Sequence, residues 1–182
     1  MVTSAKALAK GKRREMQREE IRSLGGFVWS IADILRGDFK QSEYGKVILP
    51  FVVLRRLDCI LEVSKKQVLE TATSLPDNVD DATRDMILFG AVGGNVNVYN
   101  LSALTFASLK GQDPSQLHRN LVDYITKFSA NVRDIFLDKF LFTEQLKRLN
   151  DSDILWSVFQ RVSEIDLHPD LSLIHISSPR DS

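Results

Sequence analysis

The sequence lacks the residues that several common classes of protein depend on. Cys59 is the only cysteine among 182 residues, so an internal disulfide framework is excluded. Cys59 sits in an apolar helical pattern, and we expect it to be a buried core thiol in a reducing compartment. The longest apolar run, 47–54, has about eight residues, whereas a helix needs about twenty to cross a bilayer. No apolar segment follows the basic N-terminus, so no signal peptide is expected. These absences predict a cytoplasmic protein without a membrane segment.

Motifs for catalysis, cofactors and metals are also missing. The five prolines are never adjacent, so there is no Asn-Pro-Pro-aromatic loop of the kind that holds a flipped base. Gly90, Gly93 and Gly94 do not form G-x-G-x-x-G, and no strong strand pattern precedes them. The histidines His118, His168 and His175 lack partners at metal-ligand spacing. The sequence therefore predicts no catalytic, cofactor-binding or metal-binding residue in this chain.

Charge is balanced overall but concentrated at the N-terminus. The formal net charge is zero, from 24 basic and 24 acidic side chains, so contact with nucleic acid would have to rest on a local patch. Residues 1–22 hold seven basic and three acidic side chains, a local charge of +4. We interpret them as a basic arm, partly disordered or helical. The arm is either a solvated terminus or a contact to DNA phosphates or a partner. The candidate contact residues are Lys10, Lys12, Arg13 and Arg14.

Apolar spacing predicts an all-α domain over residues 23–170, an irregular multi-helix bundle. A first helix is expected after Gly25–Gly26, ending at Gly37 in the left-handed conformation. A central helix is expected over 43–70, with a kink or short break at Pro50 because proline lacks an N–H. The valine- and glycine-rich stretch near 92–99 predicts an irregular loop or a short β-pair. Asp113 and Pro114 are a typical start of a later helix.

Arg55 and Arg56 close the apolar run of the central helix. They point about 100° apart on a helix, so they cannot both face one partner. One interpretation pairs them with Asp58 or Glu62 on the same helix. The other makes them contacts to DNA phosphates or to a partner subunit. The sequence leaves both interpretations open.

Two long strings resemble one family. SEYGKVILPFVVLRRLD at 42–58 and NLVDYITKFSANVRDIF at 120–136 are similar to the N-terminal helical domain of the modification subunit of type I restriction–modification systems. The resemblance covers residues 23–170. It implies an adenine-specific DNA methyltransferase that uses S-adenosylmethionine, with its C-terminal catalytic domain beyond this chain. The implied partners are DNA, a specificity subunit and a restriction subunit. The implied role of this domain is DNA clamping and subunit assembly, with no cofactor bound by the chain and no activity alone.

Two further expectations concern the C-terminal tail and the alternative function. Residues 171–182, LSLIHISSPRDS, have no face to bury, and we interpret them as a non-native tail. The alternative function is a stand-alone helical module, either a protein-interaction module that docks through Val47–Leu54 or a DNA-binding domain. Strong salt dependence of duplex binding would favour the latter.

Overall fold

The protein is all-α, as the sequence predicts. The computed structural model describes residues 2–93 and 96–168, so the expected tail at 171–182 lies outside the described residues. Within them no helix is long and apolar enough to cross a membrane. The elements in chain order are α1 (Val2–Leu35), the 3₁₀ turn η1 (Gln41–Glu43), α2 (Tyr44–Leu61), α3 (Lys65–Ser74), α4 (Asp81–Val92), α5 (Phe106–Lys110), the 3₁₀ turn η2 (Pro114–Gln116), α6 (Leu117–Thr126), α7 (Ala130–Asp134), the π-helical turn η3 (Ile135–Lys139), α8 (Phe142–Asp151) and α9 (Leu155–Glu164).

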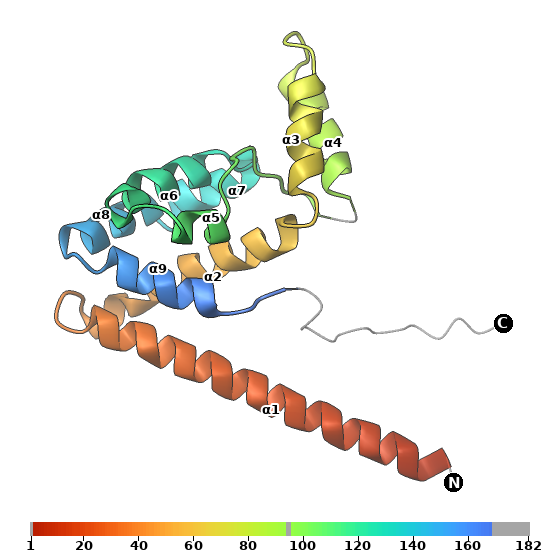
Figure 1. Cartoon of the computed structure of the whole chain (residues 1–182), viewed down its shortest axis with the longest axis vertical. Coiled ribbons are helices and arrows are strands. Elements are labelled where there is room, and N and C mark those ends of the chain that lie inside the picture. The colour runs from red at the N-terminus through yellow and green to blue at the C-terminus, as the bar shows by residue number, and fades with distance from the viewer. Residues whose placement is uncertain (1, 94–95, 169–182) are drawn as a thin grey trace.

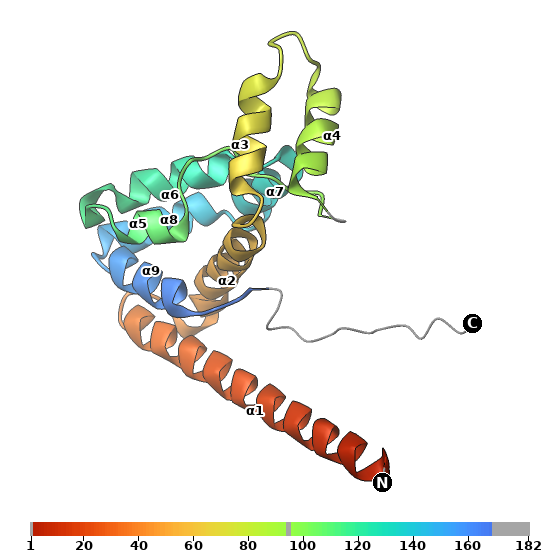
Figure 2. The same ribbon diagram turned by 45° about the vertical axis from the view of Figure 1, so that its right-hand side comes forward.

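The helices form one body with two projections. Figure 1 shows α2, α5, α6, α8 and α9 packed together, with the α3–α4 hairpin rising on one side. The N-terminal part of α1 runs away from this body, and Figure 2 shows the same separation after rotation. The structure thus consists of a packed centre, a hairpin and a long helical arm.

The main core is formed by apolar faces that repeat at helical spacing. Phe51 and Leu54 of α2 are fully buried, as are Leu121 of α6 and Phe159 of α9. Aromatic rings fill the centre, and the ring centroids of Phe51 and Phe142 lie 4.9 Å apart in an edge-to-face contact. This geometry is favourable because the positive edge of one ring meets the negative face of the other. A smaller cluster joins α3 and α4 through Val68, Leu88, Ala91 and Tyr99.

The helix boundary predicted at Gly37 is present, whereas the predictions for the central helix and for the start of α1 need correction. Gly37 has φ of 105°, which confirms the predicted left-handed residue after α1. Of the kink or short break expected at Pro50, the break does not occur, because α2 continues through Pro50; the helix predicted over 43–70 is interrupted at Glu62–Ser64 instead. α1 does not begin after Gly25–Gly26 but runs from Val2, since the Ala-, Lys-, Arg- and Glu-rich arm has high helix propensity that outweighs the cost of single glycines.

The β-pair expected near 92–99 is not present among the described residues of that stretch. Val96, Asn97, Val98 and Tyr99 form an irregular segment, and residues 94–95 lie outside the description. One isolated bridge pairs Asn100 with Phe128. It is supported by bonds from the Leu101 N–H to the Lys127 carbonyl (2.9 Å) and from the Ser129 N–H to the Tyr99 carbonyl (3.0 Å). The loop is held by α6 and α7 rather than by a second strand.

Candidate functional site

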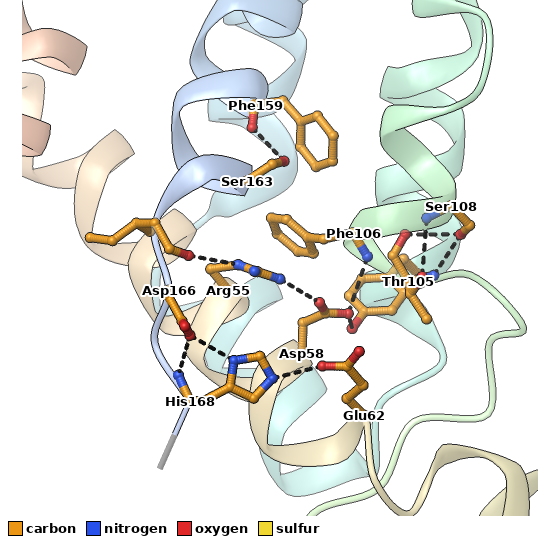
Figure 3. Close-up of polar contacts among 12 residues, drawn as sticks. Arg55, Asp58, Glu62, Thr105, Phe106, Ser108, Phe159, Ser163, Asp166 and His168 are labelled. Carbon is orange, nitrogen blue, oxygen red and sulfur yellow. Dashed lines mark hydrogen bonds and ion pairs between the residues drawn. The ribbon is translucent and has the colours of Figure 1, made fainter. Parts of the chain in front are cut away.

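A polar cluster centred on Asp58 crosses the middle of the domain. The Asp58 side chain is nearly buried and accepts three hydrogen bonds (Figure 3). The donors are Arg55 Nη1 (2.9 Å), the Phe106 backbone N–H (3.2 Å) and the Tyr124 hydroxyl (3.0 Å). A buried carboxylate requires such partners because desolvation of its charge is costly. Asp58 therefore ties α2 to α5 and α6 in one network.

Tyr124 is the buried end of this network. Burial raises the pKa of its hydroxyl well above the usual tyrosine value, and the neighbouring Asp58 carboxylate raises it further. The hydroxyl consequently stays protonated and continues to donate to Asp58. Its ring also contacts Phe106 and Phe128, so the same side chain serves both the polar network and the aromatic core.

Arg55 and Arg56 hold the segment that follows α9, which we name the strap (residues 165–168). Arg55 Nε donates to the Ile165 carbonyl at 3.1 Å, while its guanidinium lies 5.5 Å from the centre of the Phe106 ring. Arg56 Nη1 donates to the Leu167 carbonyl. The predicted pairing of Arg55 with Asp58 is present in the structure. Contact of either arginine with DNA or a partner subunit stays a prediction.

His168 lies at the end of the strap between two carboxylates. Its Nδ1 is 2.6 Å from Asp166 Oδ1, and its Nε2 is 2.7 Å from Glu62 Oε2 (Figure 3). Asp166 and then Glu62 raise the pKa of His168, while His168 lowers the pKa of Asp166. Sequence analysis considered His168 only as a metal ligand and did not predict these two hydrogen-bond partners. The Asp166 contact could have been found from the D-x-H spacing, but Glu62 is 106 residues away.

Cys59 lies beneath the strap and is buried, as predicted. Burial raises the pKa of its thiol, and the Leu167 backbone N–H partly offsets this rise. Within residues 2–93 and 96–168, Cys59, Asp166 and His168 are the group whose ligand atoms lie close enough to share a metal ion, within 4.8 Å of one another. However, both His168 nitrogens stand at hydrogen-bond distance from carboxylates. The geometry is that of a hydrogen-bonded network, which an ion would first have to disrupt.

A small cavity of about 250 Å³ opens beside this network. Its charged lining combines Arg55 and Lys110 with Asp58 and Glu62, and His168 closes one side. Both signs of charge are thus presented to any occupant. The mixture gives no strong preference for an anion or a cation.

The basic arm belongs to α1, and part of it can be described in detail. Arg14, Arg18 and Arg22 are exposed, and their spacing of four places them in one row along the helix. The side chains of the predicted contact residues Lys10, Lys12 and Arg13 lie outside the described residues, although their backbone is helical. Trp29, further along α1, is 68% exposed.

Val47–Leu54, the docking surface expected for the alternative function, packs largely into the core. Val47, Pro50, Phe51 and Leu54 are buried, whereas Leu49 is exposed. A partner could therefore reach only a narrow part of this run without unfolding α2. This burial disfavours the run as a docking surface.

Lys65, at the start of α3, is a titratable group that sequence analysis did not single out. Its Nζ lies 5.3 Å from the centre of the Tyr124 ring and 3.5 Å from Asn100 Oδ1. Burial lowers its pKa to about 8 from the usual 10.5, partly offset by Asp58. Between these two values the unfolded chain binds more protons than the folded one, so stability rises with pH.

We expect Lys65→Met to remove this rise. At pH 7 the variant should be more stable than the wild type by about 1 kcal/mol, because a partly buried charge is replaced by an apolar chain of similar length. The difference should shrink between pH 8 and pH 10. Urea denaturation of both proteins across this range measures it. A difference that is constant with pH would contradict the lowered pKa.

A family model described as HsdM N-terminal domain matches residues 24–162, which is most of the chain and includes the Asp58 network. No curated protein and no solved structure matches the sequence.

Proposed function

Because this chain belongs to the HsdM N-terminal domain family, that of the type I restriction–modification modification subunit, we propose that it places duplex DNA and neighbouring subunits for adenine methylation. The observation that carries the proposal is α1. It projects from the body (Figure 1) and presents Arg14, Arg18 and Arg22 in one exposed row. Cationic side chains spaced along a helix can contact successive phosphates and position DNA without reading its sequence.

The proposed partners are DNA, the specificity subunit and the restriction subunit of a type I complex. Arg14, Arg18 and Arg22 span about 12 Å at 1.5 Å per residue, a distance comparable to several phosphates along one strand. Glu15 and Glu19 stand one residue after Arg14 and Arg18. These carboxylates moderate the field, which suits a contact that works together with other subunits rather than tight binding by this domain alone.

We further propose that transfer of the methyl group from S-adenosylmethionine to adenine depends on residues outside this chain. The sequence supports this because it contains neither a glycine-rich cofactor turn nor an Asn-Pro-Pro-aromatic loop. The isolated chain should give background methyl transfer to duplex DNA in an assay with labelled S-adenosylmethionine. Turnover above background would reject this part of the proposal.

The DNA-positioning role is tested by a triple variant, Arg14→Gln, Arg18→Gln and Arg22→Gln. Duplex affinity, measured by fluorescence anisotropy at several salt concentrations, should fall about tenfold or more at low salt. If all three contact phosphates, the slope of log K against log salt should decrease by about 2.7, or 0.9 per contact.

A matched triple variant keeps the same change in charge at exposed positions elsewhere: Lys66→Gln, Lys147→Gln and Arg161→Gln. These cations lie on α3, α8 and α9, away from the arm. We expect the control to keep most of the wild-type affinity. Equal losses in the two triple variants would show that only total charge matters and would contradict a specific role for α1.

A further inference from the structure

The position of His168 restricts the charge state in which the strap is fully held. Each imidazole nitrogen faces a carboxylate oxygen, at 2.6 Å for Asp166 and 2.7 Å for Glu62. Neutral histidine carries a single N–H and can donate to only one of them, whereas the imidazolium ion donates to both. In the neutral state one nitrogen lone pair would face a carboxylate. Full closure of this contact therefore requires a protonated ring.

The rest of the strap is fastened through its backbone. Arg55 and Arg56 donate to the carbonyls of Ile165 and Leu167, and the Leu167 N–H is close enough to the Cys59 thiol to lower its pKa. Arg55, Arg56 and Cys59 all lie on the side of α2 that the strap crosses, which we name the polar face of α2 (Figure 3 shows the Arg55 contact). These contacts do not change charge near neutral pH, because arginine stays protonated and burial raises the pKa of Cys59. His168 is thus the side chain of the strap that links its attachment to protonation.

We propose that the strap and the polar face of α2 form a proton-sensitive latch, closed when His168 is an imidazolium ion and loosened when it is neutral. The latch fixes the direction in which the backbone leaves α9. It joins the C-terminal end of α2, capped by Glu62, to the segment that follows α9. This inference rests on side-chain geometry and is independent of the proposed contact with DNA.

The surrounding charges favour the protonated ring. The groups that face His168 are Asp166 from the strap and Glu62 and the Cys59 thiol from α2, and the shared cavity adds Arg55, Asp58 and Lys110. Arg55 is already paired with Asp58 at 2.9 Å. Because the pKa of His168 is raised above 6.5, the latch is complete below pH 6.5 and opens as pH rises through the raised value.

The test measures amide hydrogen exchange at Leu167 in the full chain at pH 6 and pH 9. EDTA is present throughout, and rates are corrected with an unstructured peptide of the same sequence. Protection of the wild type should fall about fivefold at pH 9, a change in the range of an exposed ion-pair network. In His168→Gln, protection should be low at both pH values. Glu62→Gln should give an intermediate response.

Two matched variants separate the latch from other titrations. His118→Gln removes a histidine on α6, outside the strap, and should keep the wild-type response. Lys65→Met removes the other group that titrates in this range and should also keep it. If His168→Gln shows the same dependence on pH as the wild type, or if the wild type shows none, the latch is rejected. An NMR titration of the His168 ring gives a direct second measurement, and a pKa at or below 6.5 would equally reject it.

Discussion

Replacing Asp58 with alanine is expected to lower the free energy of unfolding by about 3–5 kcal/mol, because it removes one partner of a buried charge pair. The Arg55 guanidinium, the Tyr124 hydroxyl and the Phe106 N–H would all lose their acceptor. Unpaired polar groups in a buried site bear the full desolvation cost. Urea denaturation monitored by circular dichroism measures the change.

Asp33→Ala is the matched control. Asp33 also forms an i,i+3 pair with an arginine, Arg36, at 2.7 Å, but both side chains are mostly exposed. Its removal should change stability by less than about 1 kcal/mol. A similarly small effect for Asp58→Ala would show that the network contributes little. Asp58→Asn should fall between the two, because an amide oxygen still accepts from neutral donors but no longer pairs with the Arg55 charge.

Phe51→Ala is expected to destabilise the domain by about 3–5 kcal/mol, the usual cost of truncating a buried phenylalanine. The Phe51 side chain is fully buried and makes an edge-to-face contact with Phe142 across the α2–α8 interface. The variant leaves a cavity that the surrounding aromatic rings cannot fill without leaving their rotamers. Thermal and urea unfolding should both report the loss.

Leu49→Ala on the same helix provides the control for this substitution. Leu49 is two residues away and 54% exposed, and leucine and alanine have similar helix propensity. We expect its cost to stay below about 1 kcal/mol. A cost equal to that of Phe51→Ala would mean that the face of α2 carrying Leu49 is buried in solution. The two variants together test the orientation of α2 in the core.

The sequence predicted the fold where a local rule determines the structure. Gly37 adopts a positive φ, and Asp113 accepts the Ser115 N–H at the start of η2, because turn and cap chemistry depends on neighbouring residues. At Pro50 the sequence predicted a kink or a short break, and the break is absent: burial on several sides holds α2 as one helix despite the missing N–H. The end of α4 falls after Gly90, and the positive φ belongs to Gly93. Gly93 and Gly94 lie close behind Gly90, and the local sequence pattern does not identify which glycine ends the helix.

The candidate site was less accessible to sequence reasoning. The Arg55–Asp58 pair could be predicted from its helical spacing, but Tyr124 joins it from 66 residues away. Likewise, the strap reaches Arg55 across 110 residues. Such contacts depend on how helices pack, which periodicity does not specify. The buried position of Asp58 could not be inferred, because a charged residue on a helix is usually exposed.

The length of α1 turns a small rotation at its anchored end into a large displacement at its tip. A helix of 34 residues is about 51 Å long at 1.5 Å per residue. Ile31 and Leu35 fix one end of this lever in the core. Pivoting by only 10° would sweep the tip through about 9 Å and Arg14, about 31 Å from Leu35, through about 5.5 Å, which exceeds one base-pair step of about 3.4 Å. Packing around two aliphatic side chains therefore governs which phosphates the distant arginines could reach.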